Sequence, residues 1–253
     1  TPRNAQNENN RDIDTAPDAY DVDVTRVVQR LQTTPQAVDV TWLPGSEKNT
    51  QSPDGFTLNK AVALTLKEAG VSELYSHQKK ATLEVLKMKK SVVIATPTAS
   101  GKSLCYLVSL LIRLSKTKSS RAVLLFPLKA LARDQLLKPQ KFTSAAGRLA
   151  NSGKFDSDKK LVARLHAISK ITSACCDGDS TEGEQKLMND EKTQVILTNP
   201  DTLHHRILPG YTSGKWSTPF WQNLEFIVLD EAHTQRGVAG SHVSNVLRRV
   251  LQV

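Results

Sequence analysis

The stretch from Ala95 to Ser103 reads ATPTASGKS, and it decides how the rest of the chain is interpreted. It ends in Gly101-Lys102-Ser103, as the phosphate-binding pattern G-x-x-x-x-G-K-[ST] does, although Thr96 stands where the first glycine is expected. The β-branched run SVVIAT (91–96) predicts a strand before the loop, and apolar periodicity predicts a helix over 102–115. This order suits an anion site, because the N–H groups at a helix N-terminus point toward the anion.

The residue types of this loop predict a nucleotide cradle. Lys102 would reach the β- and γ-phosphates, and the Ser103 hydroxyl would ligate Mg²⁺. Gly101 lets the backbone approach a phosphate closely. The backbone of Thr98, Ala99 and Ser100 completes the predicted site for the nucleotide. On these residues alone, a Gly-Lys-Ser that merely opens a helix remains an alternative.

A second feature lies in the segment FIVLDEAH, from Phe226 to His233. An apolar strand is predicted to end in two adjacent carboxylates, Asp230 and Glu231. In an enzyme with a phosphate loop, the first acid holds Mg²⁺ and the second orients and deprotonates the attacking water. The alternative is a pair of acids at a strand end that are solvated or cap the next helix.

Short apolar runs alternate with helical periods through most of the chain. Strands are predicted over 91–96, 122–127, 171–176, 194–199 and 225–230, and helices over 102–115, 128–137, 181–188 and 241–251. This alternation predicts an α/β fold, a parallel sheet with helices on both faces. Ligands of such sheets bind beyond the carboxyl ends of the strands, where both motifs fall.

Composition narrows the class of partner. The 253 residues carry 34 Lys and Arg against 25 Asp and Glu, a net charge of +9 that favours an anionic partner such as nucleic acid. Three cysteines without C-x-x-C spacing argue against a disulfide framework and a zinc site. No apolar run approaches the roughly 20 residues of a membrane span, so no membrane partner is expected.

Three regions are expected along the chain. Residues 1–20, rich in Asn, Asp and Pro, predict a disordered lead-in. Residues 21–69 form an accessory segment, in which 41–56 is turn-rich and 58–69 is helical. Residues 70–253 form the nucleotide-binding domain, in which 143–160 is expected to be a surface insertion. A short helix is also predicted from Tyr20 to Leu31.

Motif order gives a family resemblance. TPTASGKS and DEAH resemble motifs I and II of superfamily 2 DExH-box helicases, FPLKALARDQ (126–135) resembles motif Ia, and TNPDTLHH (198–205) resembles motif Ib. LYSHQKKA contains Gln78 just before motif I. DGD (177–179) and DEAHTQRGVAGSHVSNVLRR (230–249) are similar to the YprA-like, RecQ-related branch, which includes mitomycin-repair factor A and the RecQ-four-like helicases.

The resemblance implies a RecA-like (P-loop NTPase) domain, the first of two, from an ATP-dependent 3′-to-5′ DNA helicase of genome maintenance. ATP and Mg²⁺ are the implied cofactors, with Gln78 reading adenine, and a nuclear location follows from the family and the polar N-terminus. A second RecA-like domain with an arginine finger is expected beyond Val253, and His233 is expected to couple ATP state to it. The chain alone should therefore hydrolyse ATP poorly and not unwind.

The implied nucleic-acid contacts involve the single-stranded backbone. Lys129 and Arg133 lie at i, i+4 on one predicted helix face and would take two phosphates, whereas a solvated face is the alternative. Thr198 and Asn199 offer further phosphate donors. Arg236 is either a salt-bridge residue or a DNA contact.

Other histidines and aromatic residues are expected to be structural. His204, His205 and His242 have no further metal-ligating residues at a suitable spacing in the sequence, and the aromatic side chains of KWSTPFW (215–221) are expected to pack rather than to stack on bases.

Two other functions remain open for the chain. One is an RNA helicase or remodeller of the same superfamily, and the other is a non-catalytic nucleic-acid-binding module.

Overall fold

The structure is a computed structural model that describes residues 41–44, 50–96, 100–212 and 218–252. The predicted lead-in at 1–20 and the helix predicted at 20–31 lie outside the described residues. Residues 41–253 form one compact unit. Within the described ranges, no helix is both long and apolar enough to cross a bilayer.

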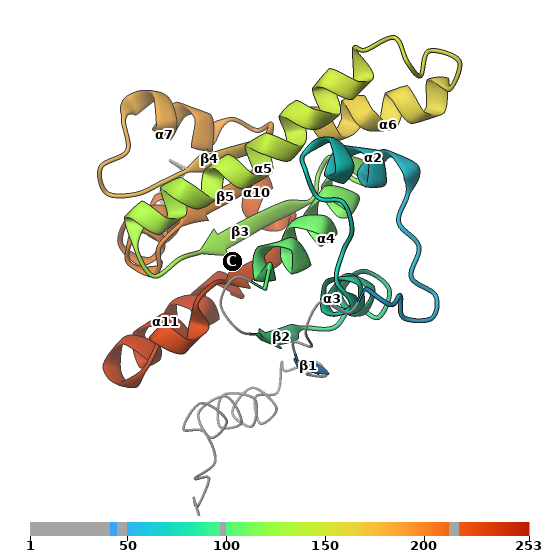
Figure 1. Ribbon diagram of the computed structural model, residues 1–253. Helices are drawn as coiled ribbons and strands as arrows, with labels where there is room; N and C mark the ends of the chain where they lie inside the picture. Colours follow the sequence, from blue (N-terminus) through green and yellow to red (C-terminus); the bar gives the residue numbers. More distant parts are fainter. Residues whose placement is uncertain (1–40, 45–49, 97–99, 213–217, 253) are drawn as a thin grey trace, which may run out of the picture. The chain divides into compact units, whose positions relative to one another are not determined.

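Strands and helices alternate along this unit (Figure 1). The strands are β1 (Thr41–Pro44), β2 (Val92–Ala95), β3 (Arg121–Leu125), β4 (Thr172–Cys175), β5 (Thr193–Thr198) and β6 (Leu224–Leu229). The longer helices are α2 (Lys60–Glu68), α3 (Ser76–Leu86), α4 (Lys102–Lys116), α5 (Lys129–Ala150), α6 (Lys159–Ser169), α7 (Glu182–Asn189) and α11 (Gly237–Val250). The shorter turns are α8 (Pro200–Thr202), η1 (Leu203–Ile207), α9 (Leu208–Thr212), α10 (Thr218–Gln222) and η2 (Ala232–Thr234).

All pairings among the described strands are parallel, as predicted. Four strands form one sheet in the order β4-β5-β3-β6, and β1 pairs with β2 in a second sheet of two strands. In β3, the residues from Ala122 to Leu125 pair with β5 on one side and with β6 on the other. The loops that follow β3, β5 and β6 therefore emerge at the same edge of the sheet.

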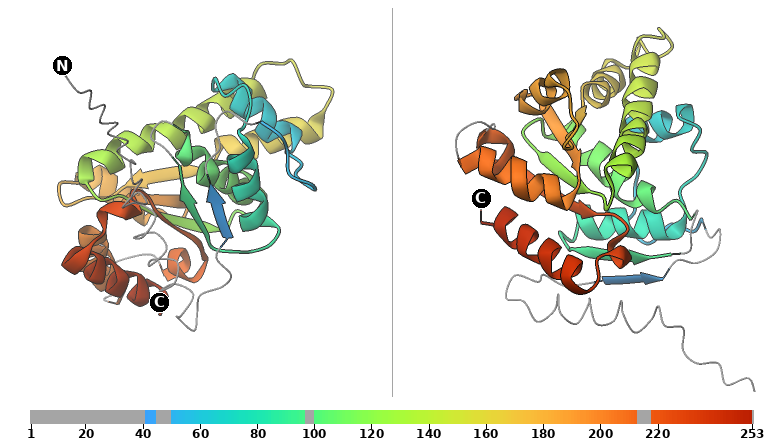
Figure 2. Two further views of the ribbon diagram at one scale, coloured as in Figure 1. Left: turned by 60° about the horizontal axis from the view of Figure 1, so that its bottom comes forward. Right: turned by 90° about the vertical axis from the view of Figure 1, so that its left-hand side faces the viewer.

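The four-stranded sheet is covered on both faces (Figures 1 and 2). In β3, Ala122 and Leu124 belong to the core cluster formed with α2, α4, α5 and α6, whereas Val123 and Leu125 belong to the cluster formed with α7, α10, α11 and the turns after β5. Successive side chains of a strand point to opposite faces, so a strand covered twice is apolar throughout. This explains why the strands were predictable as continuous apolar runs.

Two local predictions were wrong in part. The segment 143–160 is not a surface insertion throughout, because α5 continues to Ala150 and α6 begins at Lys159, and only the connection at 151–158 is a mostly exposed turn region. Ala145 and Ala146 are fully buried in the core cluster, and their small side chains allow helices to pack closely. The segment 41–56 is not a loop throughout, because residues 41–44 form β1. Propensity could not indicate this strand, since its pairing with β2 spans about fifty residues of sequence.

Candidate nucleotide and nucleic-acid site

The phosphate-loop segment connects β2 to α4, as the sequence predicted. Gly101 is the residue before α4 and has a φ of +76°, in the left-handed region that glycine adopts without strain. The Gln78 amide Nε2 donates to the Gly101 carbonyl over 3.1 Å, and a Cβ on Gly101 would lie 2.6 Å from that nitrogen. The backbone conformation therefore favours glycine here, and a Cβ would also displace the Gln78 amide from its hydrogen bond to Gly101. Thr98 and Ala99 lie outside the described residues.

The side chain of Lys102 turns back onto its own loop. Its Nζ donates to the carbonyl oxygen of Thr96 over 3.0 Å, and the Thr96 hydroxyl is hydrogen-bonded to the Ser100 hydroxyl. Thr96 thus contacts the residues at the start of α4 through both its carbonyl and its hydroxyl. A threonine at the position expected for the first glycine therefore contacts both Ser100 and Lys102.

The two acids after β6 occupy a strained turn. The Asp230 N–H donates to the Leu125 carbonyl over 2.9 Å and extends the ladder between β6 and β3. Asp230 Oδ1 accepts the Glu231 N–H over 2.9 Å, and Glu231 has a φ of +51°. A non-glycine residue in the left-handed region costs about 1–3 kcal/mol, a strain that is typical of functional sites.

Ser103 and Asp230 share a neighbour on α5, Lys138. Lys138 Nζ donates to Ser103 Oγ over 2.8 Å. Burial lowers the pKa of Lys138, and the negative charge of Asp230 opposes that shift. An ammonium group therefore rests against the hydroxyl and near the carboxylate that were predicted to ligate Mg²⁺. Oxygen donors that already attract a cation fit the preference of magnesium for oxygen ligands.

Tyr106, on α4 three residues after Ser103, also reaches the acids. Its phenol donates to Asp230 Oδ2 over 3.2 Å. Burial, followed by the charge of Asp230, raises the pKa of Tyr106 well above its usual range, so the phenol remains a hydrogen-bond donor at neutral pH. Sequence reasoning missed Tyr106 and Lys138. The position of Tyr106 one turn after Ser103 was a usable signal for it, whereas nothing in the sequence distinguished Lys138.

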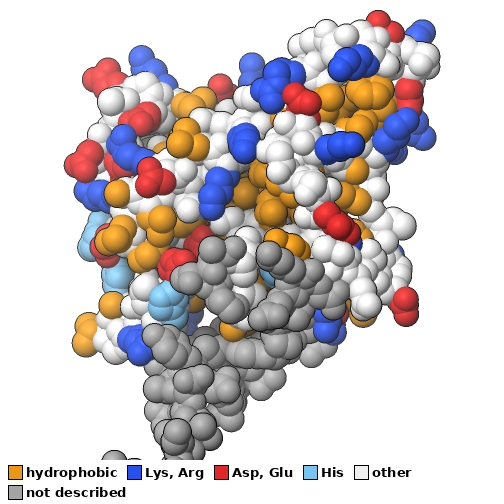
Figure 3. Space-filling model, viewed as in Figure 1, with side chains coloured by type: hydrophobic (Ala, Val, Ile, Leu, Met, Phe, Trp, Pro, Cys, Tyr) orange, Lys and Arg blue, Asp and Glu red, His pale blue; other side chains and the backbone are white. Residues whose placement is uncertain are grey.

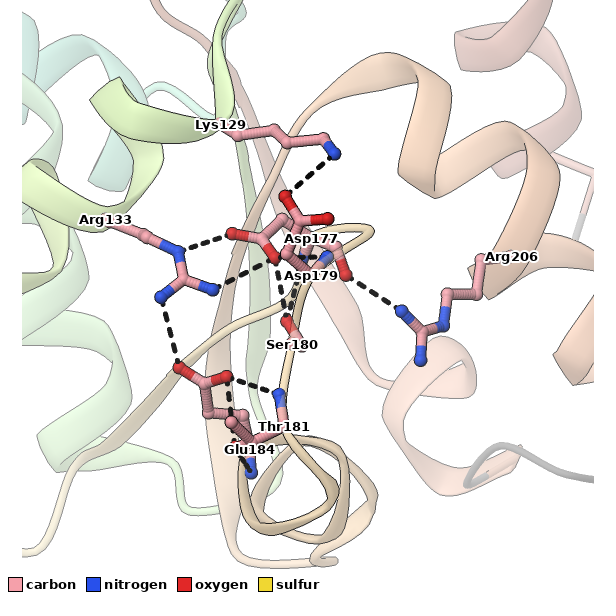
Figure 4. Close-up of polar contacts among 8 residues, drawn as sticks. All are labelled: Lys129, Arg133, Asp177, Asp179, Ser180, Thr181, Glu184 and Arg206. Atoms are coloured by element: carbon pink, nitrogen blue, oxygen red, sulfur yellow. Dashed lines mark hydrogen bonds and ion pairs between the residues drawn. The ribbon is translucent and has the colours of Figure 1, made fainter.

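Lys129 and Arg133 both contact acids from the loop after β4 (Figure 4). Lys129 Nζ lies 3.1 Å from Asp179 Oδ2, and Arg133 Nε lies 2.6 Å from Asp177 Oδ2. The hydrogen bonds from Arg133 are the main reason that the pKa of Asp177 is lowered from its usual value. Sequence reasoning noticed the DGD segment but assigned it no role.

Thr198 and Asn199 are buried at the end of β5. Asn199 Oδ1 accepts the Thr202 N–H over 2.8 Å and thereby caps α8. The Asn199 amide Nδ2 has no hydrogen-bond partner among the described residues. Phosphate contacts from these two residues stay predictions.

Arg236 and His233 lie exposed beyond the acids. Arg236 Nε donates to the His233 carbonyl over 2.9 Å, and His233 Nδ1 lies 3.2 Å from Glu231 Oε2. His233 therefore contacts the acid that was predicted to act on water. Its coupling role and a DNA contact by Arg236 stay predictions.

His204, His205 and His242, for which the sequence indicated no common site, lie close together. The ring centroids of His204 and His205 are 4.5 Å apart, and those of His204 and His242 are 5.0 Å apart. Arg249 Nη1 lies 2.6 Å from His204 Nδ1. Within the described residues, no group of three or more His, Cys, Asp or Glu side chains has the arrangement of a metal centre.

Charge is distributed rather than concentrated on one visible face. Figure 3 shows Lys and Arg side chains interspersed with Asp and Glu side chains, not gathered into one basic patch. The charge of individual basic side chains is therefore partly neutralised locally by acids, as in the pair of Lys129 with Asp179. Individual residues, more than a broad basic field, must define an anion site on this face.

Residues 75–252 match the family described as DEAD/DEAH box helicase, and the chain belongs to this family. Within it, the chain lies in the YprA- and MrfA-like branch of superfamily 2, of which it represents the N-terminal RecA-like domain. It is 35% identical over 210 residues to YprA of Bacillus subtilis (strain 168), named an uncharacterized ATP-dependent helicase, covering 83% of this chain and 24% of YprA. It is 34% identical over 179 residues to the ATP-dependent helicase HRQ1 of Saccharomyces cerevisiae (strain ATCC 204508 / S288c), covering 71% of this chain and 14% of HRQ1.

Solved structures agree with this placement. The DUF1998 helicase MrfA, in a crystal structure with DNA and AMPPNP, is 32% identical with a TM-score of 0.62 over 90% of this chain and 29% of MrfA. The predicted RecA-like parallel sheet is thereby confirmed. The chain spans about a quarter of the length of YprA and less of HRQ1.

Proposed function

We propose that this chain is the nucleotide-binding motor domain of an ATP-dependent DNA helicase. The observation that carries the proposal is the proximity of Ser103, at the start of α4, to Asp230, at the end of β6. Tyr106, one turn after Ser103 on α4, donates to Asp230 Oδ2 over 3.2 Å, and Lys138, which donates to Ser103 Oγ over 2.8 Å, also experiences the charge of Asp230. Two segments far apart in sequence thus supply a hydroxyl and a carboxylate to one place. A P-loop NTPase needs this pair to hold magnesium.

Each residue of the nucleotide site would have its own role. Lys102 would exchange the Thr96 carbonyl for the β- and γ-phosphates, which the N-terminus of α4 also attracts. Ser103 and Asp230 would hold Mg²⁺, which supplies charge neutralisation at the transferring phosphoryl group. Glu231 would orient and deprotonate water. Gln78 would read adenine while holding Gly101, although its Oε1 already accepts the Tyr75 N–H over 2.9 Å.

We propose single-stranded DNA as the partner. The support is the similarity to MrfA, whose crystal structure is described as bound to DNA, and the position of Lys129 at the start of α5. Lys129, Thr198, Asn199 and Arg236 are the proposed phosphate contacts, and Arg133 is a proposed residue of the same interface. Contacts to phosphates read no bases, as a translocating motor requires. Matched oligo(dT) and oligo(U) titrations test the alternative of an RNA helicase, which predicts tighter binding to RNA.

Full activity would require more than this chain. We propose that a second RecA-like domain supplies an arginine finger, an addition that is worth about 10³–10⁵ in rate in related NTPases.

We propose a nuclear location on the basis of the RecQ-related resemblance and the polar first residues, and imaging of a tagged full-length protein tests it.

The Lys102→Ala substitution tests the nucleotide site. We expect the 253-residue chain to bind a fluorescent ATP analogue in the presence of Mg²⁺, and the variant to lose at least tenfold in affinity. An unchanged affinity would contradict the phosphate-loop assignment. A wild-type chain without any nucleotide binding would favour the non-catalytic nucleic-acid-binding module. In the full-length protein, Glu231→Gln should retain nucleotide binding but lose turnover.

A further inference from the structure

The carboxylate of Asp177 is buried and fully engaged. Its side chain is only 1% exposed, and it receives two hydrogen bonds from Arg133, from Nε to Oδ2 over 2.6 Å and from Nη2 to Oδ1 over 3.1 Å. Oδ1 also accepts the Asp179 N–H over 2.9 Å and the Ser180 hydroxyl over 3.2 Å. A buried carboxylate with this many donors fixes the position of every group that it contacts.

These contacts join three segments that are separate in sequence (Figure 4). Arg133 belongs to α5, within the segment that resembles motif Ia. Arg206 belongs to η1, just after the segment that resembles motif Ib, and its Nη1 donates to the Asp177 carbonyl over 2.9 Å. Glu184 belongs to α7, and its Oε1 lies 3.7 Å from Arg133 Nη1. Asp177 therefore sits at the junction of both segments predicted to contact nucleic acid.

Lys129 is held in a different way from Arg133. The two basic side chains are similarly exposed, Lys129 by 49% and Arg133 by 46%, but their partners differ: the side chain of Asp179 is 77% exposed and that of Asp177 only 1%. Such exposed ion pairs contribute about 0–1 kcal/mol, so a phosphate can replace Asp179 at little cost. Removing Arg133 from Asp177 would instead leave a buried carboxylate without its cation, which is strongly unfavourable.

We propose that Asp177 and Arg133 are positioning residues that hold the motif Ia and motif Ib segments in register, and that Lys129 is the phosphate ligand of α5. This inference rests on the proposed function. It divides the two basic residues at i, i+4 into one that binds and one that positions. Asp179 is then the group that a DNA phosphate displaces from Lys129.

The salt dependence of DNA binding separates the two roles. Each phosphate contact to a single strand contributes about 0.7 to the slope of log K against log [salt]. Anisotropy titrations of the 253-residue chain with fluorescein-labelled oligo(dT), between about 50 and 200 mM salt, measure this slope. We expect Lys129→Ala to reduce the slope by about 0.7, and Arg133→Ala to weaken binding without that change.

Conservative variants sharpen the test. Lys129→Arg should retain affinity, because only a positive charge is needed. Arg133→Lys should lose about as much affinity as Arg133→Ala, since an ammonium cannot make the two parallel hydrogen bonds. Asp179→Asn should tighten binding about two- to fivefold, because the competing carboxylate charge is gone. Asp179 is exposed, so this variant tests the proposal even if the Arg133 variants fold poorly.

Arg148→Ala is the matched control on the same helix. Arg148 forms an exposed ion pair with Glu68, at 3.1 Å, and its loss removes one positive charge near the other end of α5. We expect it to leave the slope unchanged. Equal slope changes in Lys129→Ala and Arg133→Ala, or full affinity in Arg133→Lys, would overturn the division of roles while leaving DNA binding intact. A wild-type chain that does not bind oligo(dT) at low salt would overturn both this inference and the proposed DNA partner.

Discussion

Replacing Lys138 by methionine should make nucleotide binding less dependent on magnesium concentration. The Lys138 ammonium donates to Ser103 Oγ over 2.8 Å and interacts with Asp230. A magnesium ion held by the same two side chains must first displace this ammonium. Methionine keeps most of the length and apolar character of the side chain but removes the competing charge.

The size of the effect follows from one hydrogen bond. Hydrogen bonds that involve a charged group contribute about 1.5–3 kcal/mol, and the partial exposure of Lys138 favours the lower end of that range. Because about 1.4 kcal/mol corresponds to tenfold in an equilibrium constant, the Mg²⁺ concentration for half-maximal nucleotide binding should fall about tenfold.

The assay is a magnesium titration with a fluorescent, non-hydrolysable ATP analogue. Lys141→Met is the control, because Lys141 is exposed one turn further along α5 and carries the same charge. An unchanged magnesium midpoint in Lys138→Met would refute the reasoning. A large loss of nucleotide affinity at saturating magnesium would refute it differently, by making Lys138 a phosphate ligand.

Three further predictions test the loop, the thiols and the core. Gly101→Ala should reduce nucleotide affinity at least tenfold in the same binding assay, because a φ of +76° strains a residue that has a Cβ and this Cβ would displace the Gln78 amide. Burial raises the pKa of Cys105 to about 12 and those of Cys175 and Cys176 to about 11, so iodoacetamide at pH 8 should modify these three thiols only after unfolding, as mass spectrometry would show. Leu165→Ala should lower the free energy of unfolding by about 2–5 kcal/mol in urea titrations, because Leu165 is completely buried.

The strands and the phosphate-loop helix were predictable because their signals are local. The strands are short runs that are apolar on both faces, and α4 begins at Lys102, where the loop pattern ends. The second half of α5 was missed because its buried residues are mainly alanines, among polar and basic neighbours that resemble a loop. Burial of alanine depends on the partner helix, here α6 among others, and sequence periodicity does not reveal that partner.

The contacts around the site could not be predicted for a related reason. Ser103 meets Lys138, and Arg133 meets Asp177, through pairings that depend on how α4, α5 and the loop after β4 are placed on the sheet. Motif matching identifies side chains that would contact a ligand. It does not identify the protein groups that these side chains contact when no ligand is bound.

A chain with a net charge of +9 has more basic than acidic side chains, and its motifs do not indicate how repulsion among the basic side chains is reduced. Basic side chains gathered to bind phosphates repel one another unless acids or polar oxygens lie between them. Here the Thr96 carbonyl holds Lys102, while Asp179 holds Lys129. Both groups bind their lysine weakly, so a phosphate can replace them. Replacing the buried Asp177 as the partner of Arg133 is costly. The strength of the interaction with the protein partner, more than the type of basic residue, therefore distinguishes two kinds of basic side chain. Some can exchange that partner for a phosphate, and others stay in place.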